Sequence, residues 1–447
     1  MKKILIFLGI ISYSILVNAQ TPTTEYWTNK QKKSEGIKKN EIREGKWIYW
    51  YQNGQKWSEG SYLAGEQTGY WIFWHVNGKK QAEYTAENGT YTTWFENGIV
   101  ESEGLLADKQ REGNWKYYHP NGKLKRDCKY SHGQLTGTFK EFHDNAVVAQ
   151  EGTYVNGKLN GYSIWWNRNG IKEIEGKLVD DLQDSIWIYY HPNGKIASTG
   201  PFLNNEVNGA WIYYYEAGNV WKKGSYEEGK RAGKWVAWFE DGKKQREGSF
   251  VNGKESGFWQ QWYKNGQLKD EGSFSDGEMD KTWNGFYYDG KPEYVISYKI
   301  GQKDGLATYW YQNGKLMSKC NYKSNKKEGS WTKWAENGKL LEVGVYKNDK
   351  KNGNFVFYDK YGGKNRSQEF KDDRPEGKWQ EFYPNGKKLA EGIYNNRIKE
   401  GIWTNWSADG NIMLQVEYKK GLKTRVIKEF KPTTNGKKKN ETVAPTF

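Results

Sequence analysis

The chain of 447 residues has few cysteines, prolines and methionines: two, nine and four. Its longest apolar run, residues 4–17, is shorter than the ~20 residues that span a bilayer. We therefore predict no transmembrane segment in the mature chain. The sequence also has no HExxH, GxSxG, P-loop or GxGxxG pattern, so it predicts no enzyme, no catalytic residue and no cofactor.

Aromatic residues and glycine are abundant, with 24 Trp, 33 Tyr, 17 Phe and 52 Gly. Many of them belong to one pattern that opens, in sixteen copies, at Gly45, Gly69, Gly89, Gly113, Gly137, Gly161, Ser185, Gly209, Gly233, Gly257, Lys281, Gly305, Gly329, Gly353, Gly377 and Gly401. Every step is 24 residues except the step from Gly69 to Gly89, which is 20. A constant period of this length is typical of a repeat array.

Within each copy we number the opening residue 0. Position 5 is aromatic in all sixteen copies and position 2 in fourteen, with Ser163 and Ala307 as the exceptions at position 2. We assign a structural, ring-packing role to the tryptophans of position 2 in seven copies: Trp47, Trp71, Trp115, Trp187, Trp211, Trp235 and Trp259.

Position 9 is Gly in fifteen copies, and Asn or Asp precedes it in fourteen. Asn-Gly between aromatic and β-branched residues predicts a β-hairpin with a two-residue type I′ turn, which gives Gly54, Gly78 and Gly122 a structural role. This register sets position 2 opposite position 15 and position 0 opposite position 17, whereas a bulged turn would shift it by one residue and exchange the two faces. Position 15 is Gly in ten copies, so we expect each large ring to cover the glycine across its own hairpin.

These features predict an all-β protein of a single domain, an elongated antiparallel meander of about sixteen β-hairpin repeats. Residues 1–19, with a basic start, an apolar run and Ala19 at the end, predict a signal peptide and an exported mature chain in the periplasm or outside the cell. Residues 20–44 hold a partial repeat expected to cap residues 45–424, the array itself. Residues 425–447 are expected to form a capping strand and a basic disordered tail.

The repeat resembles a known family. It is similar to the MORN-repeat variant (membrane occupation and recognition nexus) of bacterial YwqK-like antitoxin proteins. The similarity lies in a Gly, a Trp two residues on, an aromatic pair, Asn-Gly-Lys, Glu-Gly-x-Tyr and a closing Asn-Gly-Lys-x-x-Gly. Residues 46–62 and 377–394 match it closely. The resemblance implies an elongated antiparallel β array used for protein contacts, in some members as the neutralising partner of a toxin. It implies no catalytic motif, and the signal peptide departs from a cytoplasmic antitoxin.

Reactive side chains follow the period as well. Four of the five histidines occupy position 6, where other copies have tyrosine, which indicates packing rather than metal binding: His75, His119, His143 and His191. The cysteines, Cys128 and Cys320, both occupy position 15 and lie 192 residues apart. A stacked array separates them by much more than the ~7 Å that a disulfide allows. We predict neither a metal site nor a disulfide.

The formal net charge is +15, and much of the excess lies in the first turn of the repeats, at Lys79, Lys123, Lys195, Lys291, Lys315, Lys339 and Lys387. Basic groups among aromatics can bind nucleic acid, but export argues against that partner. An acidic protein or an anionic envelope surface suits this charge better.

Two functional classes stay open. One is a scaffold that binds another protein; the other is a module that binds carbohydrate or the cell envelope through exposed rings. The candidate binding surface in both is position 5: Trp50, Trp74, Trp94, Trp166, Trp238, Trp262, Trp310, Trp334 and Trp406. Coplanar, exposed rings at position 5 would favour sugar; buried rings would favour protein contact or a purely structural core.

Overall fold

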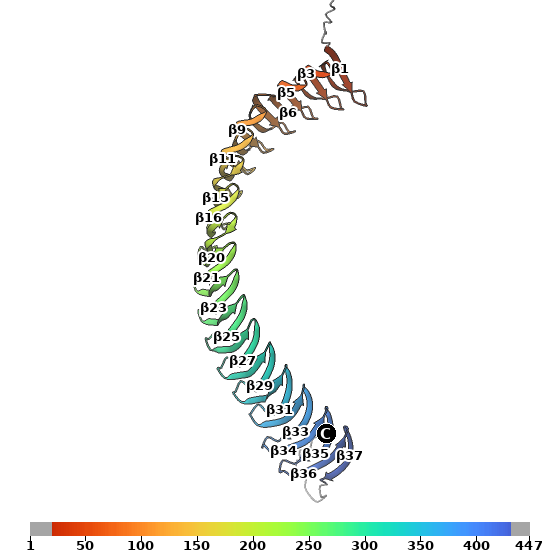
Figure 1. Ribbon diagram of the computed structural model, residues 1–447, viewed down its shortest axis with the longest axis vertical. Coiled ribbons are helices and arrows are strands. Elements are labelled where there is room, and N and C mark those ends of the chain that lie inside the picture. The colour runs from red at the N-terminus through yellow and green to blue at the C-terminus, as the bar shows by residue number, and fades with distance from the viewer. Residues whose placement is uncertain (1–19, 431–447) are drawn as a thin grey trace, which may run out of the picture. The chain divides into compact units, whose positions relative to one another are not determined.

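A computed structural model describes residues 20–430 and contains strands and loops but no helix in that range (Figure 1). The predicted all-β, antiparallel repeat fold is confirmed. The predicted signal peptide and the tail from residue 431 lie outside the described residues. The chain divides into two compact units, residues 1–207 and 208–447, which are described separately.

The strands of the first unit are β1 (Gln20–Tyr26), β2 (Lys32–Lys39), β3 (Ile42–Trp50), β4 (Lys56–Leu63), β5 (Glu66–Trp74), β6 (Lys80–Thr85), β7 (Gly89–Trp94), β8 (Val100–Ala107), β9 (Gln110–Tyr118), β10 (Leu124–Ser131), β11 (Gln134–Phe142), β12 (Val148–Val155), β13 (Lys158–Leu159), β14 (Gly161–Trp166), β15 (Lys172–Val179), β16 (Leu182–Tyr190), β17 (Ile196–Leu203) and β18 (Glu206–Val207).

The strands of the second unit are β19 (Gly209–Tyr214), β20 (Val220–Glu227), β21 (Lys230–Trp238), β22 (Lys244–Val251), β23 (Lys254–Trp262), β24 (Leu268–Ser275), β25 (Glu278–Phe286), β26 (Pro292–Lys299), β27 (Gln302–Trp310), β28 (Leu316–Lys323), β29 (Lys326–Trp334), β30 (Leu340–Lys347), β31 (Lys350–Tyr358), β32 (Lys364–Lys371), β33 (Arg374–Phe382), β34 (Lys388–Asn395), β35 (Ile398–Trp406), β36 (Ile412–Lys419) and β37 (Leu422–Glu429).

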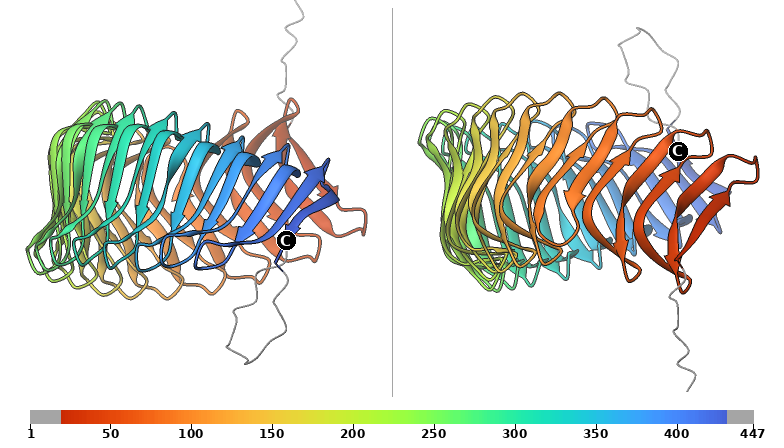
Figure 2. Two further views of the ribbon diagram at one scale, coloured as in Figure 1. Left: turned by 90° about the horizontal axis from the view of Figure 1, so that it is seen from below. Right: turned by 90° about the horizontal axis from the view of Figure 1, so that it is seen from above.

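Strands of each unit lie side by side in chain order, as both views of Figure 2 show, and they pair antiparallel, with the short β13 and the next strand β14 both paired to β12. The hairpin β3–β4 gives the register. Gly45 lies opposite Tyr62, and Trp47 lies opposite Gly60. The predicted pairing of position 0 with 17 and of position 2 with 15 is therefore confirmed for this part of the hairpin.

The predicted type I′ turn at positions 8 and 9 is wrong. In the hairpin β23–β24, the Tyr263 N–H donates to the Gln267 carbonyl at 2.8 Å, and the Gly266 N–H donates to the Tyr263 carbonyl at 2.8 Å. Gly266 has a φ of 92°, but Asn265 does not have a positive φ. This is a three-residue loop that ends in a left-handed glycine and adds a bulge, the alternative that Asn-Gly also permits.

The type I′ geometry occurs instead in the second turn, which joins one repeat to the next. Between β22 and β23, Asn252 and Gly253 have φ values of 50° and 83°, and Val251 pairs directly with Lys254. Positive φ at both central residues of a two-residue loop is the requirement of a type I′ turn. The two edges of the sheet therefore carry different loops.

Position 0 lies in a bulge of the first strand in repeats such as the one that opens at Gly257. Glu247 pairs with Gln260 and Ser249 with Ser256, so three residues of β23 stand opposite Gly248. Gly257, at position 0, has a φ of 71° in this bulge, a conformation that glycine adopts at no steric cost.

The ring that covers most position-15 glycines comes from the next repeat, not from the same hairpin as predicted. Gly152 is the exception, because the next repeat has Ser163 there and the Phe139 ring of the same hairpin lies near the glycine. A Cβ on Gly60 would lie 2.1 Å from the Trp71 ring, and a Cβ on Gly248 would lie 2.0 Å from the Trp259 ring. The Trp259 Nε1–H also donates to the Ser249 carbonyl at 3.2 Å, inside the bulge. Glycine at position 15 thus makes room for the contact that joins successive repeats.

Candidate functional site

The seven tryptophans assigned to packing, Trp47, Trp71, Trp115, Trp187, Trp211, Trp235 and Trp259, are all buried. Rings of position 17 pack edge-on between them: Phe250 lies 6.1 Å from Trp235 and 5.1 Å from Trp259. The Arg231 guanidinium covers this cluster, 5.0 Å from the Trp235 ring centroid. We call this set of position-2 and position-17 side chains the aromatic row. Its buried members form separate core clusters, such as Trp47 to Ala86 and Trp115 to Phe139 in the N-terminal unit and Trp235 to Trp259 in the C-terminal unit.

The predicted binding residues at position 5 are each half-buried: Trp50, Trp74, Trp94, Trp166, Trp238, Trp262, Trp310, Trp334 and Trp406. In several repeats the lysine at position 11 of the preceding repeat lies over the ring. The Lys244 ammonium is 5.4 Å from the centroid of Trp262, and it also pairs with Glu247 at 3.0 Å. Lys56 lies over Trp74 and Lys388 over Trp406 in the same way.

This lysine–glutamate pair shifts the carboxyl. Partial burial raises the pKa of Glu247, but the hydrogen bonds and charges of Lys244 and Lys234 together lower it by more, so the net pKa lies below the ordinary value. The ring, lysine and carboxylate hold one another in place. A sugar that stacked on these rings would have to displace the lysine.

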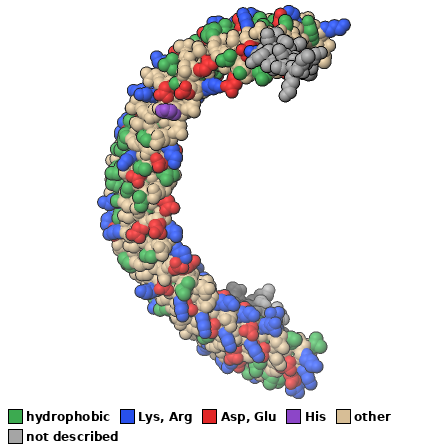
Figure 3. All heavy atoms as spheres, turned by 45° about the horizontal axis from the view of Figure 1, so that its top comes forward, with side chains coloured by type: hydrophobic (Ala, Val, Ile, Leu, Met, Phe, Trp, Pro, Cys, Tyr) green, Lys and Arg blue, Asp and Glu red, His purple; other side chains and the backbone are tan. Residues whose placement is uncertain are grey.

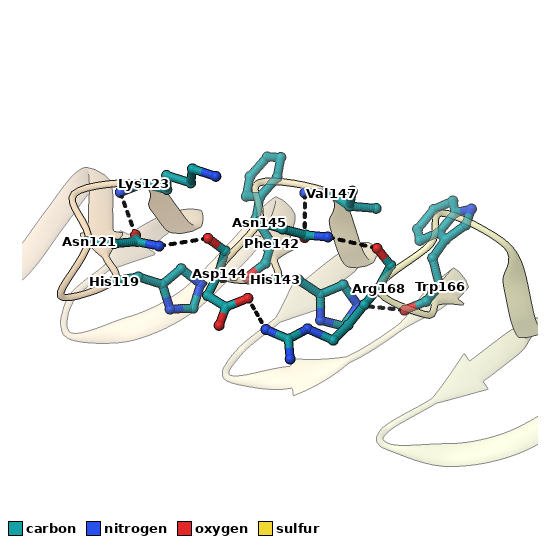
Figure 4. A network of polar contacts seen from close by, with 10 residues as sticks. All are labelled: His119, Asn121, Lys123, Phe142, His143, Asp144, Asn145, Val147, Trp166 and Arg168. Carbon is teal, nitrogen blue, oxygen red and sulfur yellow. Dashed lines mark hydrogen bonds and ion pairs between the residues drawn. The ribbon is translucent and has the colours of Figure 1, made fainter.

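The first-turn loops form a ladder of hydrogen bonds between successive repeats (Figure 4). The His119 Nε2 lies 2.9 Å from the Phe142 carbonyl, and the His143 Nε2 lies 2.9 Å from the Trp166 carbonyl. A carbonyl only accepts, so each imidazole donates. Tyr263 donates its hydroxyl to the Phe286 carbonyl at 2.9 Å from the same position. Histidine and tyrosine are thus equivalent donors at position 6.

The asparagine at position 8 has two roles in the same ladder. The Asn121 Oδ1 accepts the Lys123 N–H at 3.0 Å, which closes its own loop, and the Asn121 Nδ2–H donates to the Asp144 carbonyl of the next loop at 2.8 Å (Figure 4). An ion pair of Arg168 with Asp144 adds to the contact of the following two loops. The Asn-Gly pair was recognised from the sequence, but this inter-repeat bond was not.

Several turn lysines expected to form a free electrostatic surface also belong to this ladder. The Lys79 Nζ donates to the Asn97 carbonyl at 2.8 Å, the Lys315 Nζ to Asn337 at 2.8 Å and the Lys387 Nζ to Asp409 at 3.1 Å. Their charge is exposed, but their position is determined by the neighbouring loop.

Comparison with known families assigns the repeat. Eleven segments match the family described as the MORN repeat variant: residues 43–64, 87–107, 111–132, 183–204, 207–228, 231–252, 257–276, 303–324, 327–348, 375–396 and 399–420. Together they make up more than half of the chain. The chain belongs to this family. No curated protein matches the MORN repeat chain.

Several solved structures are similar to this MORN repeat chain at low sequence identity. The complex of TcdB2, TccC3 and Cdc42 matches with 10% identity and a TM-score of 0.15, over 89% of this chain and 24% of that chain. The Tc holotoxin pore of Photorhabdus luminescens matches with 11% identity and a TM-score of 0.15, over 89% and 23%. The chain therefore spans about a quarter of the length of these proteins.

The second turns of the MORN repeats carry a surface that the sequence reasoning missed. In the C-terminal unit, positions 18 and 21 pair like charges directly across the turn in three successive repeats: Lys323 with Lys326, Lys347 with Lys350, and Lys371 with Arg374. We call these six exposed residues the basic row. Figure 3 shows Lys and Arg side chains gathered over this unit. The sequence shows lysine at position 18 in these repeats, but the register of the second turn was needed to recognise that it faces another basic residue at position 21.

Two of the three turns also contain carboxylates, which lower the local net charge: Asp349 beside Lys350, and Asp372 and Asp373 between Lys371 and Arg374. Asp349 accepts the Lys327 N–H at 2.7 Å, and Asp373 accepts the Lys351 N–H at 2.8 Å. No residue of the basic row forms an ion pair with any group between residues 20 and 430. In the N-terminal unit the corresponding pairs are not basic: Leu63 with Glu66, and Val179 with Leu182.

Metal ligands, membrane-spanning helices and cysteines complete the description of residues 20–430. This range contains no cluster of three His, Cys, Asp or Glu side chains able to hold a metal, and no helix that could cross a membrane. Cys128 and Cys320 are free and buried. Burial raises the pKa of the Cys128 thiol to about 11, so this thiol is a poor nucleophile at neutral pH.

Proposed function

We propose that this MORN repeat protein is a non-catalytic, exported scaffold that binds an acidic surface of another protein over several repeats, with the basic row as the main contact. The family and the fold support a repeat scaffold. Export rests on the signal peptide predicted for residues 1–19. Neutralising a toxin would be one form of such binding, and that idea rests on the family resemblance alone.

The observation that carries the proposal is the direct pairing of like charges in the basic row. Such pairs repel each other and destabilise a sheet, so folding does not account for them. Other repeats have Ser131 or Ser275 at position 18, which shows that lysine is not needed for the turn. A polyanionic partner would screen the repulsion between these side chains. It would also gain binding energy from several cations that recur once in each successive repeat.

The alternative, a carbohydrate- or envelope-binding module, is less well supported. It requires free ring faces at position 5, and lysines such as Lys56, Lys244 and Lys388 lie over those rings.

The proposal is tested on the full mature chain with two variants of equal net charge. The test variant has Lys323→Ser, Lys347→Ser and Lys371→Ser in the basic row. The control has Lys315→Ser, Lys339→Ser and Lys387→Ser in the first turns. The partner is first isolated from native envelope extract with the wild-type chain, and its Kd is then measured at several salt concentrations.

We expect wild-type affinity to fall as salt rises, because exposed charges are screened over ~10 Å at 0.1 M. The test variant should bind at least tenfold more weakly with a smaller salt dependence, and the control should lose much less. Equal losses in the two variants, or binding independent of salt, would refute the basic row as the contact.

A further inference from the structure

The repeat that opens at Gly69 is the short one, and it interrupts the aromatic row. Strand β6 ends at Thr85 and β7 begins at Gly89, so three residues replace the usual second turn. Position 17 of this repeat is Ala86, where full-length repeats have Tyr62, Tyr130 or Phe250. The residue of position 22, which is Arg111 in the next repeat, is absent. One ring and one long side chain are therefore missing here.

A cavity of about 560 Å³ occupies this place within the N-terminal unit. Its apolar walls are Tyr84, Ala86, Tyr91, Leu106 and Trp115. The rings are already ordered: Tyr84 lies 5.3 Å from Tyr91, and Tyr91 lies 5.7 Å from Trp115. A volume of a few hundred cubic ångströms with aromatic walls is typical of a ligand pocket.

Polar groups surround the opening and are held by bonds of their own. The Lys109 ammonium pairs with Glu66 at 2.8 Å, across the place of the missing turn. The Tyr84 hydroxyl donates to the Gln67 Oε1 at 2.8 Å. Arg111 lies over the Trp115 ring at 4.8 Å. The cavity thus combines ring walls with both donors and acceptors.

Full-length repeats show what fits such a place. In the repeat that opens at Gly113, the Tyr130 ring packs edge-on against Trp115 at 5.9 Å, and the Arg111 Nη1 lies 3.4 Å from the Tyr130 hydroxyl. Edge-to-face pairs at this separation stabilise beyond the area that they bury. An aromatic ring, as in Tyr130 or Phe250, is therefore the commonest group at this place in the row. Because Arg111 also lines the cavity at Ala86, a ring with a hydroxyl suits this cavity in particular.

We propose that the cavity at Ala86 binds a tyrosine side chain presented by a polypeptide partner, which completes the aromatic row where the chain omits a ring. The proposal rests on the proposed function as a protein-binding scaffold. It gives that scaffold one specific anchor point in addition to the charge of the basic row, and it places the anchor in the other unit of the chain.

The test uses a short glycine-flanked peptide with one 3-fluorotyrosine, observed by ¹⁹F NMR line broadening on addition of the full mature chain. Ala86→Phe should fill the cavity with the residue that Phe250 supplies at the same position. Ala210→Phe is the matched control, because Ala210 is exposed at position 1, where another repeat has Phe258. Ala86→Leu is a smaller filling variant, with Leu106 and Leu178 as precedents at position 17.

We expect the wild-type chain and Ala210→Phe to broaden the peptide signal equally, and both Ala86 variants to reduce the effect at least tenfold while their Tm stays at or above the wild-type value. An unlabelled leucine peptide should not compete. Undiminished broadening by the folded Ala86 variants, or equal competition by leucine, would overturn the proposal. The triple serine variant of the basic row should bind this peptide normally, so the two proposals fail separately.

Discussion

We call the contact between position 15 of one repeat and position 2 of the next repeat a junction. Two junctions of the C-terminal unit fill this space with a large side chain from opposite repeats. At one, position 15 is Gly248 and the next repeat supplies the buried ring of Trp259. At the other, position 15 is Ile296 and the next repeat supplies Ala307, and both are buried. The large side chain comes from the later repeat in the first case and from the earlier repeat in the second. The pair, and not either residue alone, has the volume that the junction requires.

A third junction shows the result when neither partner is small. Cys320 replaces the glycine, and Trp331 follows it. The Cys320 Sγ–H donates to the Asn321 carbonyl at 3.2 Å. In the Gly248 junction the equivalent carbonyl, that of Ser249, accepts the N–H of the Trp259 indole. The Trp331 Nε1 is buried and has no partner among residues 20–430, and its ring is only half-buried. Mismatched volume costs the junction a hydrogen bond.

The largest effect is expected for Trp259→Ala. It removes a buried indole and its bond to Ser249, so the free energy of unfolding should fall by about 3–5 kcal/mol. In a repeat array contacts run between neighbours, so hydrogen-exchange protection should be lost around Trp259 and stay unchanged around Trp47. Loss of protection in both regions would contradict the nearest-neighbour account.

Cys320→Gly should convert the mismatched junction into the common type. The indole of Trp331 could then move over the glycine and donate to the Asn321 carbonyl. We expect a gain of about 1 kcal/mol in chemical denaturation, since satisfying a buried donor outweighs the entropy cost of glycine. A loss of stability would show that the half-buried ring is not displaced by the thiol.

A smaller effect is expected in the loop ladder. Tyr263→Phe removes the hydroxyl bonded to the Phe286 carbonyl and should cost about 1 kcal/mol. Tyr263→His should retain most of the stability, because His119 and His143 make the same bond from position 6. If the histidine variant is as unstable as the phenylalanine variant, ring packing rather than the hydrogen bond is what position 6 provides.

The smallest effect is expected at the surface pair of Lys244 and Glu247. The pKa of Glu247 is lowered in the folded chain, so its contribution is present above the unfolded pKa of ~4.3 and is lost as pH falls through the folded value. Glu247→Gln should therefore cost a few tenths of a kcal/mol at pH 7, and the two proteins should converge below about pH 4. A difference that persists at low pH would mean that the charge is not its source.

The sequence was sufficient for the repeat, the strands and the pairing of Trp47 with Gly60, because these depend on patterns within one hairpin. It was not sufficient for the loop type, since Asn-Gly suits both a type I′ turn and a three-residue loop with a bulge. It also assigned the glycine to the wrong ring. The contact of Gly60 with Trp71, the bond of Asn121 to the next loop and the basic row all depend on how one repeat lies on the next, which the pattern within a repeat does not contain.

The central claim is that the stability of each junction depends on the combined side-chain volume of position 15 and of position 2 in the next repeat. A double-mutant cycle of Gly248→Ile and Trp259→Ala tests it most directly by transferring the Ile296–Ala307 pair to a glycine–tryptophan junction. Each single change should be strongly destabilising, one by overpacking and the other by a cavity. Together they should cost at least about 1 kcal/mol less than the sum of the two. Additivity within about 0.5 kcal/mol would contradict the account.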